Sequence, residues 1–465
     1  MVTEWGCDVF VCGRGNSGQL GCGTQANSKL PAPVPELDRV LRNASRITMV
    51  AAGRRHSAAI TSQGELLVWG SGAYGQLGNG DREDRHSPSK LHRALLPRSA
   101  RVVMVSCGND HTLAVTDLGS LFSFGAGGDG RLGLGDTTDR LSPCEVKRFH
   151  GAKIVYAAAG AVHSGAVTSE GRVFTWGSGY SGRLGHGDDQ GQLVPKELAW
   201  LFGSCRAVLL SAGGAHTMIL MDDGGLWGCG DGGHGKLGLG SVANELVPAR
   251  VGAREAFGRC KVLTVACGDA HTLACTDDGG LWSWGSGYGG KLGHADELDR
   301  LSPERVAAGC LNGVKVVAVA CANVHSAAVT EDGHVLTWGV GEIFFPGSQE
   351  LAGLGHEDLE RRLVPSVVDS LLEQGTRVGR FLPLSRDHSM AVAMGTHARL
   401  GTGHSMASEQ CKYLQMPAEL VQMVVEACRV WPEGVPVEAD GLARLMGGGR
   451  MRGKGDEGRQ HDAIV

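Results

Sequence analysis

The chain has 465 residues and a formal net charge of −5, with 42% hydrophobic and 20% charged residues. This composition is typical of a soluble protein, and the dispersed Lys and Arg residues argue against nucleic acid as the primary partner. Without an apolar run long enough to span a bilayer, and without a signal peptide at Met1, we expect an intracellular protein of the cytoplasm or nucleus, neither secreted nor inserted into a membrane.

Glycine and cysteine are both abundant, at 74 and 14 residues. No cysteine lies in a Cys-x-x-Cys pair, and no His-Glu-x-x-His motif occurs. Cys107 and Cys267 recur at one repeat position, where Ala52 stands in another copy, as expected of small buried side chains. The sequence therefore predicts free thiols, no metal site and no cofactor.

In chain order, the first predicted element is a strand at 8–12 with a glycine hairpin ending at Leu20-Gly21, and no histidine strand precedes it. Six complete repeats and a final half-repeat follow; each complete one has a histidine that starts a strand, a strand end that reads Trp-Gly in four copies, and a Leu-Gly hairpin end. The histidines are His56, His111, His163, His216, His271, His325 and His388. The Leu-Gly pairs begin at Leu20, Leu77, Leu132, Leu184, Leu237, Leu292 and Leu354. A proline follows six of the hairpins, at Pro88, Pro143, Pro195, Pro248, Pro303 and Pro365.

Each repeat contains short β-branched and apolar stretches, separated by Asp-Gly or Gly-x-x-Gly turns, which predict strands joined by tight hairpins. A period near 50 residues with four such strands is typical of a propeller blade. The final histidine strand, at 387–393, has no Trp-Gly hairpin after it, and the segment 8–21 supplies that missing half. We therefore predict an all-β fold, a closed seven-bladed β-propeller over residues 7–395, with one blade completed by both termini.

The pattern resembles the regulator of chromosome condensation repeat family. The residues that carry the resemblance are Gly-x-x-His-[Ser/Thr], Thr-x-x-Gly-x-[Leu/Val]-x-x-Trp-Gly and Gly-x-x-Gly-[Lys/Gln/Arg]-Leu-Gly, in fixed order. Phe124, Cys229 and Cys12 stand where other copies have Trp. A plant UV-B photoreceptor with this fold carries Gly-Trp-Arg-His-Thr turns, and the corresponding turns here lack that tryptophan. We expect Trp69, Trp176, Trp284 and Trp338 to be packing residues.

Two patterns resemble chemical sites but are better explained by structure. Three glycine stretches, at 13–18, 70–75 and 285–290, match a dinucleotide fingerprint, but a strand rather than a helix follows each. The repeated histidines lie on separate blades and cannot converge on one metal ion, so we expect each to make a structural hydrogen bond within its blade. No catalytic constellation is found, and we expect no enzymatic activity from the ring itself.

The two residues before each histidine vary between blades, in turns on one face of the predicted ring. Loops on a rigid scaffold commonly bind partners. The polar and charged candidates at these turns are Arg54, Arg55, Asn109, Asp110, Asp269, Asn323, Arg386 and Asp387.

One hairpin is enlarged: Trp338 and Gly355 are 17 residues apart, where the other copies take nine. The insertion lies within 341–352 and carries Ile343, Phe344 and Phe345 at a position expected to be exposed. Exposed aromatic groups of this kind mark partner contacts, whereas a loop folded back onto the ring would bury them.

The resemblance implies a specific alternative. The founding member of the family, a nucleotide-exchange factor for a small GTPase, has a wedge inserted at this hairpin, with Asp residues in the flanking turns. The same register places Asn323 at the first of these positions and Asp387 at the second, so one of the two matches.

Beyond the ring, the sequence predicts a helical extension over 396–446, with a helix between Met416 and Trp431, and a disordered tail over 447–465. The start of the helix, Met416 to Leu420, also compares with the start of an F-box, although the segment is too short for a complete one.

We expect a protein-protein interaction module, a scaffold or substrate-recognition subunit that binds protein partners such as a ubiquitin-ligase component. The alternative is a guanine-nucleotide exchange factor or regulator for a small GTPase.

Overall fold

The structure, a computed structural model, describes residues 9–41, 46–92, 95–97, 100–198, 205–252, 256–311, 313–345, 348–351, 353–373 and 389–393. The predicted helical extension 396–446 and tail 447–465 lie outside these residues and stay predictions. Arg386 and Asp387 also lie outside them.

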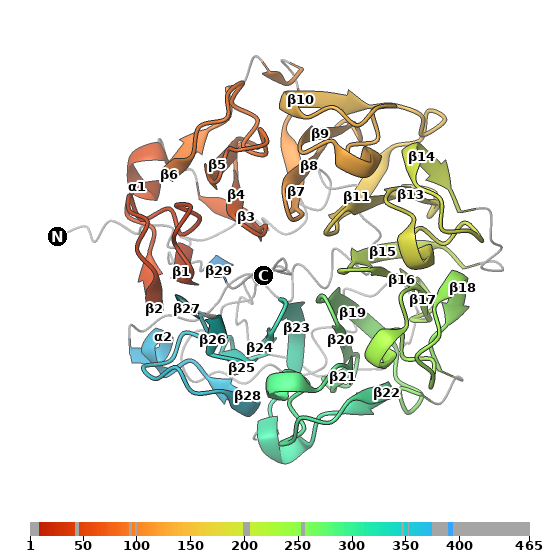
Figure 1. Ribbon diagram of the computed structural model, residues 1–465. Helices are drawn as coiled ribbons and strands as arrows, with labels where there is room; N and C mark the ends of the chain where they lie inside the picture. Colours follow the sequence, from red (N-terminus) through yellow and green to blue (C-terminus); the bar gives the residue numbers. More distant parts are fainter. Residues whose placement is uncertain are drawn as a thin grey trace, which may run out of the picture.

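Six antiparallel four-stranded sheets stand around a common centre (Figure 1). In chain order they are β3 (Ile47–Ala52), β4 (His56–Thr61), β5 (Leu66–Gly70) and β6 (Arg85–Lys90); β7 (Val102–Cys107), β8 (His111–Thr116), β9 (Leu121–Gly125) and β10 (Arg140–Val146); β11 (Ile154–Ala159), β12 (His163–Thr168), β13 (Val173–Gly177) and β14 (Gln192–Glu197); β15 (Ala207–Ala212), β16 (His216–Met221), β17 (Leu226–Gly230) and β18 (Glu245–Arg250); β19 (Val262–Cys267), β20 (His271–Thr276), β21 (Leu281–Gly285) and β22 (Arg300–Arg305); and β23 (Val316–Cys321), β24 (His325–Thr330), β25 (Val335–Gly339) and β28 (Arg362–Val367). We call these sheets blades 1 to 6. The first strand of each blade lies nearest the centre, and the last lies at the rim.

The expected seven blades are corrected to six. The remaining sheet has three strands, β1 (Val9–Gly13), β2 (Ser28–Pro33) and β29 (Ser389–Ala393), in the order β2-β1-β29. Its strand β1 pairs with β29 from Val9↔Ala393 to Gly13↔Ser389, so the two ends of the propeller do share a sheet, as predicted.

The strands begin where the sequence markers lie. In all six blades the second strand starts at the marker histidine, and every residue of that strand is buried. His56 pairs with Gly70, the glycine of the Trp-Gly pair, and Gly70 has a φ of 100°. A Cβ atom at Gly70 would lie 2.5 Å from the Arg55 carbonyl oxygen, so only glycine fits this close approach.

A proline lies within the outermost strand of each of the six blades and of the three-stranded sheet, where the strand edge is open. These prolines are Pro31, Pro88, Pro143, Pro195, Pro248, Pro303 and Pro365. Proline is tolerated at sheet edges because it has no N–H to donate to a neighbouring strand. The six that the sequence placed after hairpins are therefore edge residues.

The hydrophobic cores lie between neighbouring blades. One core joins Ile60 and Val68 of blade 1 to Val105 and Phe124 of blade 2. Radial repetition thus buries each sheet face against the next sheet.

Among the described residues, helical structure is limited to short segments. They are α1 (Leu37–Val40), α2 (Asp369–Glu373) and the single 3-10 turns η2 (Gly128–Gly130), η3 (Tyr180–Gly182), η4 (Gly233–Gly235), η5 (Tyr288–Gly290) and η6 (Ala308–Leu311). None of the helices among the described residues has the length and apolar character needed to cross a membrane.

Candidate interaction face

Hydrogen bonds from the marker histidines join neighbouring blades along the face on which we place the candidate site. His56 Nε2 lies 2.9 Å from Thr112 Oγ1 in blade 2, and the Thr112 hydroxyl donates to the Gln76 carbonyl in blade 1 at 2.8 Å. Because the hydroxyl proton is committed to that carbonyl, the oxygen accepts from the Nε2–H of the histidine. The same contact recurs at His111–Ser164, His163–Thr217, His216–Thr272 and His271–Ser326.

The prediction that each histidine bonds within its own blade was wrong. The bonds cross from one blade to the next, so they hold neighbouring blades together. Burial lowers the pKa of His56 to about 3 and the pKa of His271 well below its ordinary value, which keeps both rings neutral.

At four blade interfaces, a tryptophan donates a second hydrogen bond to the main-chain carbonyl that accepts the Ser or Thr hydroxyl. The indole Nε1–H groups of Trp69 and Trp284 donate to the carbonyls of Gln19 and Lys236, each at 2.9 Å. Trp176 and Trp338 donate likewise, to Arg131 and Lys291. All four indoles are completely buried, as expected of packing residues, and each also bonds across a blade interface.

The three departures from Trp alter this bond. Phe124 is fully buried but has no donor, so the Gln76 carbonyl accepts only the Thr112 hydroxyl among the described side chains. The thiols of Cys229 and Cys12 donate instead, to Arg183 at 3.7 Å and to Gly353 at 3.2 Å.

The turns that precede the marker histidines, which we call the histidine turns, lie on this face of the ring. Neighbouring turns are joined by main-chain hydrogen bonds. The Arg54 N–H donates to the Gly108 carbonyl, and the Gly214 N–H donates to the Gly268 carbonyl. A row of linked turns is a rigid support for the variable side chains between them.

The candidate turn residues fall into two groups on this face. Arg54 and Arg55 are exposed in blade 1, and Asn109 and Asp110 are half-buried in the adjoining turn of blade 2. The second group, in blades 5 and 6, consists of Asp269 and Asn323, both half-buried. The structure brings residues together within each group but does not join the two groups, and whether they bind a partner stays a prediction.

The enlarged hairpin forms two strands of its own, β26 (Glu342–Phe345) and β27 (Ser348–Leu351). They pair only with each other, from Glu342↔Leu351 to Phe345↔Ser348, and form a sheet separate from blade 6. Ile343, Phe344 and Phe345 therefore follow one another on one strand of this hairpin. The structure describes these three residues by their backbone, so the expected exposure of their side chains stays a prediction.

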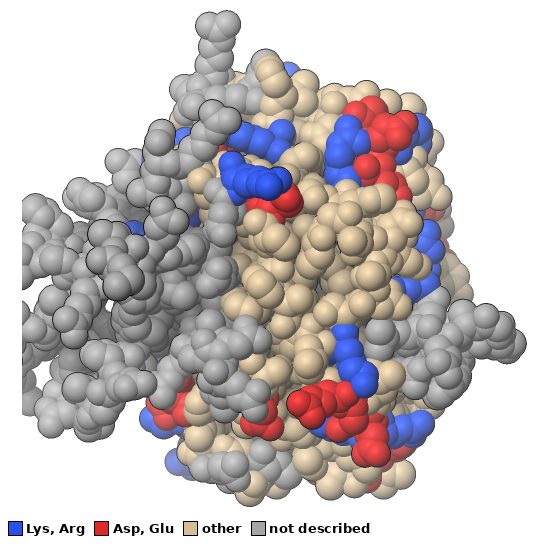
Figure 2. All heavy atoms as spheres, turned by 90° about the vertical axis from the view of Figure 1, so that its left-hand side faces the viewer, with Lys and Arg blue, Asp and Glu red and all other residues tan. Residues whose placement is uncertain are grey.

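Charged residues of the hairpins are largely paired. Asp81–Arg85, Asp136–Arg140, Asp296–Arg300 and Asp358–Arg362 form the same ion pair in four blades, at 2.7 to 2.8 Å. On the side of the ring shown in Figure 2, Lys and Arg residues lie next to Asp and Glu residues, with uncharged residues between these groups. The described part of that side has no large patch of one charge, so it offers no broad electrostatic surface for a strongly charged partner.

Two groups with metal-ligating side chains were missed by the sequence analysis: Cys205 with Asp222 and Asp223, and Cys260 with Asp277 and Asp278. They lie at the ends of the strands opposite the histidine turns. The missed signal was a cysteine followed 17 and 18 residues later by two aspartates, twice in the chain. The search for Cys-x-x-Cys could not detect ligands that only strand pairing brings together.

Comparison with known proteins gives the family. Residues 8–407 match the RCC1-like domain. The Ultraviolet-B receptor UVR8 of Arabidopsis thaliana is 38% identical over 303 residues, which are 65% of this chain and 67% of that protein. The E3 ubiquitin-protein ligase HERC2 of Homo sapiens is 35% identical over 333 residues, 71% of this chain, but the match spans only 7% of HERC2.

Solved structures agree on the fold. The structure of Prp20p from Saccharomyces cerevisiae has a TM-score of 0.72 at 22% identity, covering 85% of this chain and 93% of Prp20p. Human WBSCR16 has a TM-score of 0.71 at 23% identity, covering 84% of this chain and all of WBSCR16. With its repeat motifs, its interlocked blades and a match that spans most of its length, this chain belongs to the RCC1-like domain family of β-propellers.

Proposed function

We propose that this chain is a protein-interaction module that holds a protein partner on the face carrying the histidine turns and the hairpin β26–β27. The main support for this proposal is the hairpin β26–β27. The corresponding connection in the other blades closes within nine residues, whereas here an added two-stranded sheet stands apart from the blade.

The rigidity of the ring supports the proposal. Histidine and tryptophan bonds fix each blade against the next, so the turns keep their positions without a partner. A preorganised surface loses little conformational entropy on binding. We propose that Arg54, Arg55 and the residues of β26 are among the contacts.

The relatives suggest two classes of partner. Because HERC2 is an E3 ubiquitin-protein ligase, we propose substrate recognition or scaffolding in ubiquitination as the first class. The second class is a small GTPase, whose nucleotide exchange the chain would promote. Its support is the position of the hairpin and the likeness to Prp20p, whose structure was described with its binding properties to Gsp1p and histones.

The test replaces residues 342–352 with a short Gly-Ser turn of the length found in blade 5. Proximity labelling in the source cell compares this variant with the unaltered chain and with Leu118→Ser. Leu118 is 53% exposed in the turn after β8, at the opposite end of the strands from the histidine turns, so it serves as the matched control.

We expect the hairpin variant to lose a set of partners that Leu118→Ser retains. Retention of every partner by the hairpin variant, with an unchanged melting temperature, would overturn the proposal. To separate the two classes, the full chain is mixed with GTPases loaded with fluorescent GDP. Hairpin-dependent acceleration of release supports the exchange factor, and unchanged release supports the ubiquitination class.

A further inference from the structure

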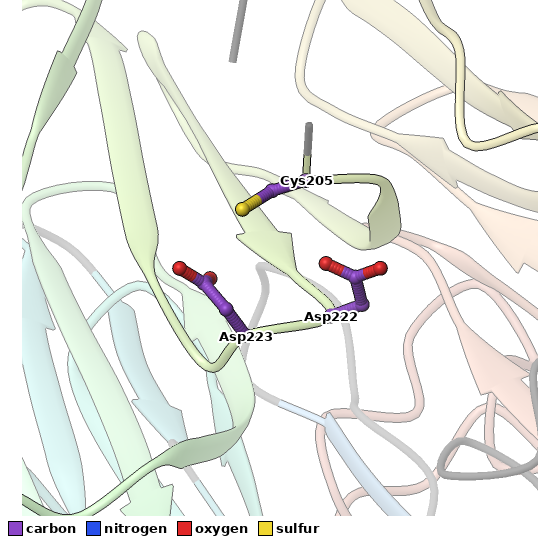
Figure 3. A group of neighbouring side chains, drawn as sticks. All are labelled: Cys205, Asp222 and Asp223. Atoms are coloured by element: carbon purple, nitrogen blue, oxygen red, sulfur yellow. The ribbon is translucent and has the colours of Figure 1, made fainter. Parts of the chain in front are cut away.

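Three potential ligands from two segments meet at the ends of the two inner strands of blade 4, on the face opposite the histidine turns. Cys205 lies two residues before β15, and Asp222 and Asp223 directly follow β16. Since β15 and β16 pair from Ala207↔Met221, these segments lie side by side. Figure 3 shows the sulfur of Cys205 and the two carboxylates turned toward a shared space, and the ligand atoms all lie within 4.8 Å of one another.

The three positions vary together among the blades. Both complete blades with a cysteine at the first position also have two aspartates at the other two, namely Cys205, Asp222 and Asp223 in blade 4 and Cys260, Asp277 and Asp278 in blade 5. The remaining blades have Ser45, Ser62 and Gln63; Ala100, Asp117 and Leu118; Ala152, Ser169 and Glu170; and Val314, Glu331 and Asp332. The turn needs no cysteine to form, so the thiol in blade 4 is not explained by the fold.

The aspartates are held in place while retaining free oxygens. Asp222 Oδ1 accepts the Arg206 N–H at 3.1 Å, and Asp223 Oδ1 accepts the Gly225 N–H at 2.8 Å. The ion pairs of the described residues include neither of these carboxylates. Asp222 Oδ2 is therefore available to a cation, and the Asp223 carboxylate accepts the Cys205 thiol, whose proton a bound cation would displace.

The electrostatics of the group also favour a cation. The charges of Asp222 and Asp223 act on the Cys205 sulfur, and so does the opposite charge of Arg250. Two carboxylates and a thiolate repel one another in the absence of a positive charge, and a divalent cation would remove that repulsion.

The corresponding group in blade 5 differs in two respects, a threonine hydroxyl and an arginine that both bind its second aspartate. Asp278 Oδ1 accepts bonds from Thr276 and Gly280, and its Oδ2 forms an ion pair with Arg305 at 2.8 Å. The guanidinium thus occupies the oxygen that a metal ion would need. Blade 5 supplies a natural control of the same composition.

We propose that Cys205, Asp222 and Asp223 form a binding site for a divalent cation of the zinc class, with one thiolate and two carboxylates as ligands and water completing the coordination. Zinc accepts sulfur and carboxylate oxygen together, and three protein ligands with an open position are a known arrangement for it. On binding, the Cys205 S–H bond breaks, a sulfur–metal bond forms, and the proton passes to solvent.

The experiment uses the full chain, purified with chelator and reductant, and then titrated with cobalt(II) chloride and separately with zinc chloride. We expect one tightly bound ion per chain, with a thiolate-to-cobalt charge-transfer band that zinc removes. Since one proton is released, the affinity should rise by about tenfold per pH unit while the thiol stays protonated. Cys205→Ser and Asp223→Asn should abolish the band, and Cys260→Ser should leave it unchanged.

Three results would overturn the proposal: no charge-transfer band in the unaltered chain, a band that persists in Cys205→Ser, or a loss of the band in Cys260→Ser as large as in Cys205→Ser. Circular dichroism keeps the test valid, because these substitutions at an accessible turn should leave the unfolding midpoint of the metal-free chain unchanged. The readout does not depend on any partner, so it stands independently of the proposed protein-binding function.

Discussion

Two neighbouring blade interfaces are built from nearly the same parts and differ in one donor. Between blades 4 and 5, the Lys236 carbonyl accepts both the Thr272 hydroxyl at 2.8 Å and the Trp284 indole at 2.9 Å. Between blades 3 and 4, the Arg183 carbonyl accepts the Thr217 hydroxyl at 2.7 Å and only the weak thiol donor of Cys229.

The comparison separates the required from the optional parts of the ring. Both interfaces keep the histidine and the hydroxyl group, whereas the indole is replaced by a thiol in one of them. We infer that the histidine–hydroxyl–carbonyl chain sets how blades meet, and that the tryptophan strengthens the contact.

The largest expected effect comes from acid, which should weaken both kinds of interface together. His56 has a folded-state pKa of about 3, and the pKa of His271 is lowered well below 6.5, because both rings are buried. The unfolded chain takes up these protons near pH 6.5 and the folded chain does not, so the stability present above pH 6.5 is lost as the pH falls toward 3. Each such histidine should cost about 1.4 kcal/mol per pH unit below 6.5.

Urea unfolding at pH 7.5 and 5.5, at constant ionic strength, measures this loss. The same comparison between pH 9 and 7.5 is the control, since neither histidine titrates there in either state. An equal free energy of unfolding at pH 7.5 and 5.5 would rule out neutral histidines as the common element of the interfaces.

The next effect should distinguish the two interfaces. Thr217→Val and Thr272→Val each remove a hydroxyl and a histidine bond, but Thr217→Val leaves the Arg183 carbonyl with only the thiol. Because an unsatisfied buried polar group costs about 1–3 kcal/mol, we expect Thr217→Val to lower the free energy of unfolding by about 1 kcal/mol more than Thr272→Val. Urea titration of both variants checks this, and a larger loss in Thr272→Val would contradict the role assigned to the indole.

The smallest expected effect is an increase in the free energy of unfolding. Phe124→Trp introduces an indole at the interface between blades 1 and 2, where the Gln76 carbonyl lacks that donor. If the larger ring is accommodated, the bond should add about 0.5–1.5 kcal/mol to the free energy of unfolding. Phe124→Leu is the control because it changes the side-chain volume without adding a donor, and a stabilisation equal in both variants would exclude the hydrogen bond as its cause.

Much of this architecture could be predicted from the sequence. Six of the seven histidines located the second strands of the six complete blades, and the unmatched half-repeats at the two ends predicted the pairing of β1 with β29. The repeated sequence shows which positions are equivalent between blades. It does not show which blade a side chain contacts, and for this reason His56 was assigned to its own blade although it bonds to Thr112 in the neighbouring blade.

The candidate site was predicted less completely. The length of the connection between Trp338 and Gly355 located the insertion. That the insertion forms a separate hairpin follows from the pairing of β26 with β27, which the sequence did not predict. Cys205 and Asp222 are distant in sequence and meet because β15 and β16 lie side by side. Contacts of this kind depend on the sheet, whereas the turns and strand starts depend on local residue patterns.

The sharing of one sheet by β1 and β29 has a consequence for synthesis. Val9 is among the first residues of the propeller to leave the ribosome, and its partner Ala393 is among the last. At about 5–20 residues per second, β1 waits roughly 20–80 seconds for that partner. Through this interval the growing chain carries an apolar strand that can pair with β2 on one side but has its other edge open. The time for which this edge is accessible to chaperones is therefore set by how far apart the ring places its first and last strands.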